Sequence, residues 1–438
     1  MKINKIVFGL VVAISSVSTT ALAQSLEECI ARGLENNFQM RIVRNEEQMA
    51  HNNASWANAG ALPELEASAG YRPSLTQWER TTMTDGNEST ERNVKVNTLT
   101  AAVTLNWTIF DGFKIQTTHK QLRALERQSE ISTRMAVEDL VADITAEYYN
   151  CVQQLIRRNN YLTSMALSRE RLRIAELNYQ TGRFSGLDYQ LARSDFHTDS
   201  ASYVRQKEAV IKSQVRLNQL MANPDLEQAL NIADTTILVR EDLLLHALWD
   251  RTIAANTSLL YAQQNAEIAE LDYRKAVSRN YPYLRLNGQY GYNDYHYNKI
   301  ATSERKNLAA SGGLTLGINL FNGNRLREQR NAKLAISNRQ FQLEQMKLNL
   351  QADLTTCYQT YRTNVELLAL QTENLNIARR NYDSALDRYK LGDLSGLDLR
   401  QVQKNLLDAE ERLLQVKYDA KICEISLLLI SGDIAKVF

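Results

Sequence analysis

The chain has 438 residues, of which 51 are lysine or arginine and 50 are aspartate or glutamate. This near-neutral balance gives no reason to expect a nucleic-acid partner. Four cysteines and five histidines are scattered without metal-ligand spacing, and no phosphate-binding loop or nucleophile motif is present, so we expect no enzyme, no cofactor and no metal site.

The first residues are typical of a secretory leader. Lys2 and Lys5 precede an apolar run, and Ala21-Leu22-Ala23 is a small-x-small cleavage pattern. We expect residues 1–23 to be a signal peptide and the mature chain to start at Gln24, outside the cytoplasm. The leader carries two lysines and no acid, so the remainder has one acid in excess.

The rest of the chain is a tandem duplication. The stretches TGRFSGLDYQ at 181–190 and LGDLSGLDLR at 391–400 share one Gly-x-x-Ser-Gly-Leu-Asp phrase. We predict a first repeat at 24–223, a linker or equatorial segment at 224–241 and a second repeat at 242–438. Other residues match at similar spacings: Ala142-Asp143 with Ala352-Asp353, Tyr148 with Tyr358, Tyr179 with Tyr389, Phe110-Asp111-Gly112 with Phe321-Asn322-Gly323, Asn36 with Asn256, and Pro63 with Pro282.

In chain order, each repeat has the pattern helix, two strands, very long helix, turn, helix. The long helices, 113–181 and 324–391, contain no proline or glycine. At 1.5 Å per residue each is roughly 100 Å long, so two shorter helices must pack along it head to tail. The other predicted elements are a helix at 26–60, strands at about 64–77 and 94–110 and a helix at 187–223 in the first repeat, and a helix at 242–281, strands at about 282–296 and 307–321 and a helix at 397–431 in the second.

The final helix carries a coiled-coil seam, in which apolar residues advance by alternating threes and fours. In the first repeat, Asp199 and Gln206 interrupt the equivalent seam. Cys423 falls within the seam, and we expect it to be a core residue rather than a redox centre. The four cysteines are too far apart in sequence to suggest a pairing, and we expect them to be free, half-buried helix residues.

The predicted strands alternate between an apolar and a small-polar face. This pattern suits the wall of a membrane β-barrel around a wet lumen, whereas a soluble sandwich would leave the long helices unexplained. Four strands cannot close a barrel, because small membrane barrels need about eight, so the chain must oligomerise. The apolar faces are Leu99, Ala101, Val103, Leu105, Trp107 and Ile109 in one strand, and Leu308, Ala310, Leu314, Leu316, Ile318 and Leu320 in the other.

The duplicated unit, the long helices, the leader and the repeated turn together resemble the TolC family of outer-membrane efflux proteins, over essentially the whole mature chain. The resemblance implies a mainly α fold with a membrane β-barrel part: a homotrimer whose protomers share a 12-stranded β-barrel, continued by a coiled-coil α-helical tunnel. It places the protein in the outer membrane of a Gram-negative bacterium, in contact with lipid and with its tunnel in the periplasm.

The function that the resemblance implies is passive export, in a tripartite efflux or type I secretion system. The channel would dock to a periplasmic adaptor (membrane fusion protein) and an inner-membrane pump. The sequence does not specify whether the cargo is a drug, a protein or a metal ion. The alternative is a periplasmic coiled-coil scaffold or adaptor, but such proteins have one helical hairpin rather than two symmetric copies.

The repeated turn has a physical role of its own. Gly182 and Gly392 are suited to the left-handed residue that ends a helix. The serines and aspartates that follow are predicted to cap the next helices and to favour the positive end of the helix dipole. The predicted capping boxes are Ser185 with Asp188, and Ser395 with Asp398.

By resemblance, Asp188, Asp398 and Tyr389 match gate positions at the periplasmic tip. Leu394 stands where some family members have a gate arginine and Gln401 where they have a second aspartate, so the same salt bridge is not available. We expect a ring of acids from Asp398, and from Asp188, to disfavour anions, although helix capping alone would also account for both aspartates. The expected adaptor contact is the pair of turns, with Gly182, Ser185, Gly186, Leu187, Gly392, Ser395, Gly396 and Leu397.

Overall fold

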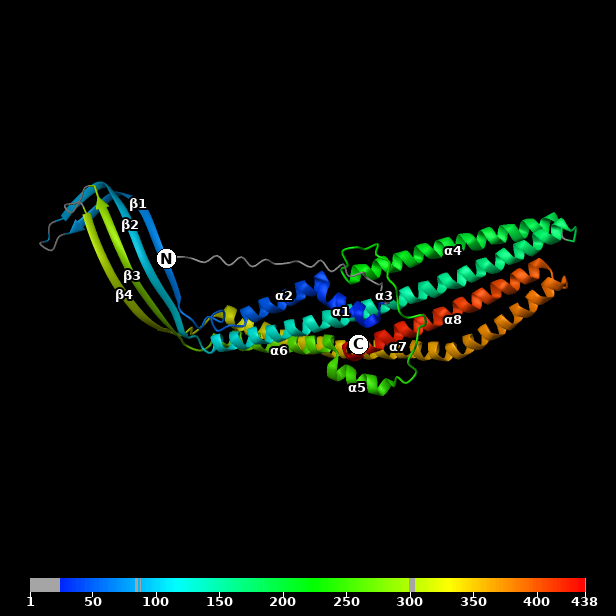
Figure 1. Cartoon of the computed structure of the whole chain (residues 1–438). Helices are drawn as coiled ribbons and strands as arrows, with labels where there is room; N and C mark the ends of the chain where they lie inside the picture. Colours follow the sequence, from blue (N-terminus) through cyan, green and yellow to red (C-terminus); the bar gives the residue numbers. More distant parts are fainter. Residues whose placement is uncertain (1–23, 83–85, 87, 184, 299–303, 438) are drawn as a thin grey trace, which may run out of the picture. The chain divides into compact units, whose positions relative to one another are not determined.

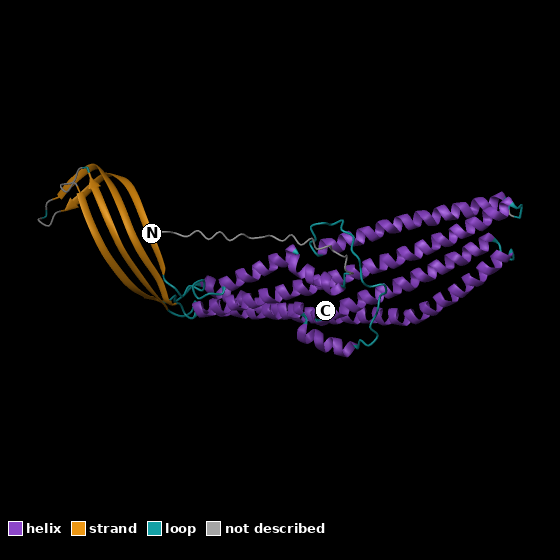
Figure 2. Ribbon diagram, viewed as in Figure 1, coloured by secondary structure: helices purple, strands orange, loops and turns teal. Residues whose placement is uncertain are grey.

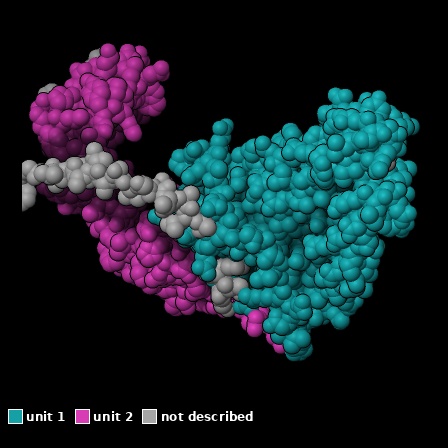
Figure 3. Space-filling view, turned by 45° about the vertical axis from the view of Figure 1, so that its right-hand side comes forward, with its two compact units in different colours: residues 1–38, 138–248, 354–438 teal, residues 39–137, 249–353 magenta. Residues whose placement is uncertain are grey.

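A computed structural model of the chain describes residues 24–82, 86, 88–183, 185–298 and 304–437. The predicted signal peptide, 1–23, lies outside the described residues. The chain forms two compact units, one from residues 1–38, 138–248 and 354–438 and the other from residues 39–137 and 249–353 (Figure 3). We call them unit 1 and unit 2, and each is described by itself.

Over the described residues the fold is mainly α-helical, with one antiparallel sheet (Figures 1 and 2). The long helices α3 and α7 contribute to both units. None of the described helices has an apolar stretch long enough to cross a bilayer. The elements are α1 Leu26–Asn36, α2 Phe38–Asn53, β1 Glu64–Thr82, β2 Glu88–Phe110, α3 Lys114–Gln180, α4 Gly186–Leu220, α5 Leu245–Ala255, α6 Thr257–Ser278, β3 Tyr283–Tyr297, β4 Glu304–Gly317, α7 Gly323–Leu391, α8 Gly396–Ser431 and α9 Ile434–Val437.

The first predicted helix of each repeat is broken in two. Asn37 separates α1 from α2, where it adopts an extended backbone, and its side-chain amide donates to the carbonyl of Leu220 at 2.9 Å. Asn256 separates α5 from α6 and caps α6 by accepting from the amide of Leu259 at 2.9 Å. By position in the fold, the counterpart of Asn256 is therefore Asn37 and not Asn36, because only Asn37 interrupts the helix.

The strands differ in length from those predicted. β1 runs on to Thr82 and β2 begins at Glu88, because the two stay paired beyond the predicted limits of 77 and 94. β4 ends at Gly317, opposite the first residue of β3, so it has no partner beyond that point. Ile318 and Leu320, predicted as part of the apolar face, therefore lie beyond the strand.

The register gives the sheet one apolar and one polar face. Val103 of β2 lies opposite Ala67 of β1 and Tyr290 of β3, and Tyr290 lies opposite Ala310 of β4. One residue along, Thr104 lies opposite Glu66 and Gln289. Because alternate residues point to opposite faces, each face keeps its character across all four strands.

Unit 2 also contains α2, α6 and the adjoining parts of α3 and α7. The rings of Trp56 and His119 stack with their centroids 3.9 Å apart, which joins the segment after α2 to α3. Gly112, before α3, has a φ of +69°, and a Cβ there would lie 2.3 Å from the carbonyl oxygen of Ser278. Only glycine fits this close approach of α6 to the start of α3.

Unit 1 packs α4 and α8 along the C-terminal parts of α3 and α7. Tyr148, Ile144 and Leu217 are fully buried in its core. Arg157 of α3 pairs with Glu411 of α8 at 2.6 Å. The predicted linker, 224–241, has no helix or strand. A parallel bridge between Ile232 and Gln24 and hydrogen bonds to α4, α7 and α8 hold it in place. A role for it around a tunnel stays a prediction.

Candidate functional site

Two tight turns end the long helices in unit 1. Gly182 and Gly392 have φ values of +74° and +83°, which is the expected left-handed conformation. A Cβ added at either position would meet nothing within 4 Å. Backbone conformation, and not lack of space, therefore makes glycine the preferred residue there.

The helices that follow begin with serine caps. In α4, the Ser185 hydroxyl accepts from the amide of Asp188, and the Asp188 carboxylate accepts from the amide of Ser185, so the capping box is complete. In α8, Ser395 accepts from the amide of Asp398 at 3.1 Å, and its hydroxyl donates to the Asp398 carboxylate at 2.7 Å. Both aspartates remain exposed.

The two tyrosines that precede the turns have different environments. Tyr389 is 2% exposed and packs in an apolar cluster with Tyr382, Ala385 and Leu399. Burial raises the pKa of its hydroxyl, the charge of Arg171 opposes this, and Asp188 adds to it. Tyr179 is 49% exposed and stacks on Tyr189. The second turn is therefore anchored by an aromatic core that the first turn lacks.

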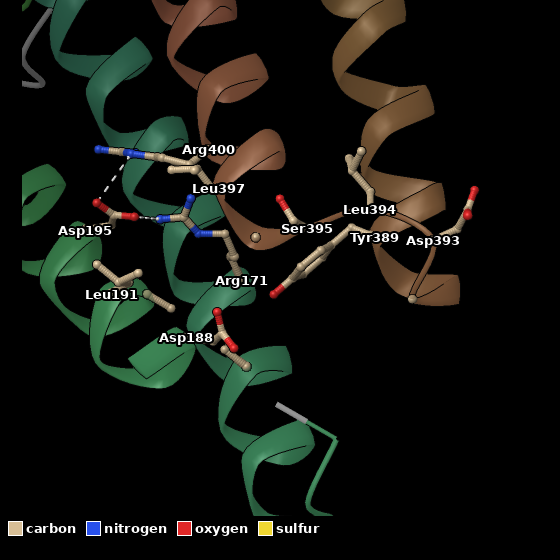
Figure 4. Close-up of a pocket in the computed structure, with 14 residues that line it drawn as sticks. Arg171, Asp188, Leu191, Asp195, Tyr389, Asp393, Leu394, Ser395, Leu397 and Arg400 are labelled. Atoms are coloured by element: carbon tan, nitrogen blue, oxygen red, sulfur yellow. Dashed lines mark hydrogen bonds and ion pairs between the residues drawn. The ribbon is translucent and has the colours of Figure 1, made fainter. Parts of the chain in front are cut away.

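A cavity of about 510 Å³ lies beside Tyr389 (Figure 4). The side chain of Arg171, from α3, is 3% exposed and donates to Asp195 of α4. Its Nε and Nη1 atoms are buried and have no hydrogen-bond partner among the described residues. Burial lowers the pKa of Arg171, against the raising effect of Asp195. The cavity thus contains two unused donors on a buried cation.

Arg400 of α8 joins the second hairpin to the first. Its two terminal nitrogens each donate to a carboxylate oxygen of Asp199, on α4, at 2.7 Å. Ser168 of α3 also donates to Asp199. Burial works against the charge of Arg400, but the hydrogen bonds and charges of Asp199 and Asp195 outweigh it and raise its pKa. A bidentate ion pair of this kind fixes the relative orientation of the two side chains in addition to pairing their charges.

Gln403, one turn further along α8, adds a second connection. Its buried amide donates to the carbonyl of Ser164 at 3.0 Å and to the hydroxyl of Ser168 at 2.9 Å. Polar bonds therefore link α8 to both helices of the first hairpin. We call the following residues the inter-hairpin network: Ser164, Ser168, Asp195, Asp199, Arg400 and Gln403.

The predicted site residues separate into two groups. Seven of them line the cavity: Asp188, Tyr389, Gly392, Leu394, Ser395, Gly396 and Leu397. Leu394 packs against the Tyr389 cluster, where its apolar side chain fits. The others are elsewhere on the turns and the start of the helices: Gly182, Ser185, Gly186, Leu187, Asp398 and Gln401.

Gln401 does not take part in the inter-hairpin contacts that the structure describes. It is exposed, and its amide donates along its own helix to Asn405 at 2.9 Å. The sequence did not identify Arg171, Asp195, Arg400 or Gln403 as site residues. The available signal was Asp199, because a charged residue within an apolar seam needs a buried partner.

In the described part of the chain, no three His, Cys, Asp or Glu side chains are grouped closely enough to hold a metal ion. The site consists instead of hydrogen-bond donors, carboxylates and an apolar cluster. Such a site can hold helices together, receive a protein surface or influence passing ions.

Comparison with known proteins covers nearly the whole chain. The family model described as "Outer membrane efflux protein" matches residues 30–223 and 248–433. The chain is 25% identical to the pyoverdine export outer membrane protein OpmQ of Pseudomonas aeruginosa over 90% of this chain and 82% of that protein. It is 18% identical to the outer membrane protein TolC of Vibrio cholerae over 97% and 94% of the two chains. The structure of the CmeC outer membrane channel of Campylobacter jejuni superposes with a TM-score of 0.76 at 16% identity, over 99% of this chain and 94% of that one.

Proposed function

Because the chain belongs to the outer membrane efflux protein family, we propose that it is the outer-membrane channel of a tripartite export system. It is a passive conduit for substrates that an inner-membrane pump delivers through a periplasmic adaptor. The pump supplies both the energy and the choice of substrate. The chain's own task is to form a path through the membrane and to control its periplasmic entrance.

The observation that carries this proposal is the two-faced sheet. Large apolar side chains on one face are exposed in the single chain, including Leu65 at 70%, Tyr71 at 64% and Leu314 at 63%. A contiguous exposed apolar surface needs cover, and lipid provides it. The opposite face carries Thr100, Thr104 and other polar side chains that suit a water-filled lumen.

Three copies would complete the barrel. Within the described chain the strand order is β1-β2-β3-β4, so β1 and β4 each pair along one side only. Unpaired strand edges are not tolerated in lipid, so a membrane sheet must close. Joining β4 of one protomer to β1 of the next in a homotrimer gives a 12-stranded barrel, which is within the range of membrane barrels.

The turns of unit 1 would form the periplasmic entrance. Asp188 and Asp398 are exposed beside the cavity and at the start of α8, and three copies of each would form a ring of negative charge. Such rings favour cations over anions. Opening requires the two hairpins to separate, and the inter-hairpin network opposes this separation.

The same turns would contact the adaptor. Leu187 and Leu397 are 68% and 75% exposed at the start of α4 and α8, where they offer apolar surface. The two unused donors of Arg171 lie in the neighbouring cavity and can donate to a carbonyl or carboxylate oxygen of a docking loop. Apolar contacts combined with a buried cation are typical of a protein-binding site.

The assembly is tested with the purified protein in detergent. We expect a trimer by light scattering, and stepwise ion conductance after addition to a planar lipid bilayer. A monomer that stays soluble without detergent and conducts no ions would overturn the proposal. Capture of an adaptor and a pump by mild crosslinking in cells tests the tripartite arrangement separately.

The acid ring is tested with Asp398→Asn, alone and with Asp188→Asn. Removal of about 1 kcal/mol of attraction for a cation lowers the cation-to-anion permeability ratio about fivefold. Asp383→Asn, at an exposed acid about two turns before the end of α7, is the matched control and leaves the ratio unchanged. Unchanged selectivity in the Asp398 variant would rule out the ring, while leaving the channel itself in place.

A further inference from the structure

Unit 1 contains a pair of thiols that the proposed channel does not use. Cys357 on α7 and Cys423 on α8 are 66 positions apart in sequence but face each other across the second hairpin. The Sγ of Cys357 donates to the backbone carbonyl oxygen of Cys423 at 3.6 Å. The two thiols are close enough for each to shift the pKa of the other. Both residues are partly exposed, so reagents can reach them.

We propose that Cys357 and Cys423 form a reversible intrachain disulfide that joins α7 to α8. The inference requires only that unit 1 is exported, because disulfides form and persist in oxidising compartments. It does not depend on the acid ring or on adaptor docking.

The environment of Cys423 makes it the attacking group. Its hydrogen bond with Cys357 lowers the pKa of the Cys423 thiol, burial opposes the effect, and the side-chain amide of Asn364 contributes by donating to its sulfur at 3.9 Å. The pKa of Cys357 is raised by the same contact with Cys423 and by burial, so Cys357 is the thiol that keeps its proton. A thiolate next to a protonated thiol is the arrangement that thiol–disulfide exchange uses.

The reaction consumes one disulfide oxidant, such as oxidised glutathione or a periplasmic protein disulfide. The Cys423 thiolate attacks one sulfur of the oxidant, which releases one thiolate and leaves a mixed disulfide on Cys423. Cys357 loses its proton to solvent and attacks the Cys423 sulfur, and the second thiolate leaves. The chain loses two electrons and two protons, and the oxidant becomes two thiols.

The other two cysteines provide an internal comparison. Cys29 and Cys151 are 1% and 0% exposed, and burial raises the pKa of both thiols, to about 11 and about 12. Buried thiols of this kind are inert. In the first repeat, Glu147 and Ser213 stand at the 210-residue spacing from Cys357 and Cys423, so only the second hairpin can acquire this link.

The test uses the full-length protein in detergent, treated with oxidised glutathione or with dithiothreitol. After denaturation in alkylating reagent, we expect two free thiols per oxidised chain and four per reduced chain, and a peptide containing Cys357 linked to Cys423 by mass spectrometry. A variant with Cys29→Ser and Cys151→Ser keeps the linkage and serves as the control. Four free thiols after oxidation, or a link involving Cys29 or Cys151, would overturn the proposal.

Single variants test the order of the steps. Cys357→Ser accumulates the mixed disulfide on Cys423, whereas Cys423→Ser reacts at least about tenfold more slowly at pH 7, because the remaining thiol is protonated. Asn364→Ala slows reaction of Cys423 with iodoacetamide at pH 7 and shifts its pH profile upward. Equal rates for the two single variants would contradict the assignment of Cys423 as the attacking group.

Discussion

Arg400 and Asp199 form a largely buried ion pair in the contact between the two hairpins of unit 1. The Asp199 side chain is 9% exposed and that of Arg400 22%, so each depends on the other to offset the loss of water. The exposed pair of Arg388 and Asp393, at 3.1 Å, is mostly hydrated. The two pairs look alike as contacts, but burial makes their expected energies very different.

Arg400→Ala is expected to weaken the inter-hairpin network by about 3 kcal/mol, because it leaves the buried Asp199 carboxylate without its arginine. Amide hydrogen exchange over the first turns of α8 measures local opening, and protection there falls roughly 100-fold. Arg388→Ala is the control, with a change of less than about threefold. Equal protection in the two variants would show that the hairpins are held together by their apolar contacts alone.

At this scale the sequence predicted the caps and the glycines but not the network. Ser185, Ser395 and the aspartates three residues on form a local pattern, and local hydrogen bonds follow from spacing. The contact of Arg400 with Asp199 joins residues 201 positions apart. The apolar seam predicted that α8 packs against another helix, but not which polar side chains meet there.

The turns at the ends of α3 and α7 illustrate two different demands on glycine. Gly392 needs only a left-handed backbone, and Gly396, at the start of α8, has ordinary dihedral angles with the Tyr389 ring in normal contact distance. Gly112 in unit 2 needs both a left-handed backbone and the absence of a Cβ. The demand for glycine is therefore weakest at Gly396, intermediate at Gly392 and strongest at Gly112.

Gly392→Ala is expected to cost about 1–2 kcal/mol from the left-handed backbone alone. Gly112→Ala costs more, because the added carbon clashes with the Ser278 carbonyl, and Gly396→Ala is neutral or slightly stabilising. Thermal unfolding of the three variants in detergent measures the order. Destabilisation by Gly396→Ala equal to that of Gly392→Ala would show that helix starts, and not left-handed residues, limit these turns.

The elements themselves were largely predictable from periodicity and composition. The long runs without proline or glycine predicted α3 and α7, because they consist largely of helix-forming residues and contain no residue that ends a helix. The breaks at Asn37 and Asn256 were not predicted, because each depends on a side-chain hydrogen bond. The Asn37 amide donates to the Leu220 carbonyl, and the Asn256 side chain accepts from the Leu259 amide. The ends of β1, β2 and β4 depend on pairing across the sheet, which a single strand does not reveal.

At the scale of the molecule, the effect of a substitution in the sheet is expected to depend on which of the two faces it lies on. Leu314 and Thr315 are neighbours in β4 on opposite faces, and both are exposed in the single chain. In the proposed barrel, Leu314 meets lipid and Thr315 meets water. The same arginine placed at either position therefore has different consequences.

Leu314→Arg is expected to cost up to about 2–4 kcal/mol per chain, depending on its depth in the bilayer, and to reduce the amount of protein in the outer-membrane fraction. Thr315→Arg is the matched control, which inserts normally but shifts ion selectivity towards anions. Membrane fractionation and bilayer conductance measure the two outcomes. Normal insertion of the Leu314 variant together with loss of the Thr315 variant would mean that the faces are assigned the wrong way round.

The two half-paired edges of the sheet have a genetic consequence. If each subunit closes the barrel only by pairing with both neighbours, a single mutant subunit inactivates every trimer that contains it. In a cell that makes normal and Leu314→Arg chains in equal amounts, random assembly into trimers leaves about one-eighth of the trimers with normal subunits alone. The mutant allele would therefore be dominant, and its effect would grow with its dose.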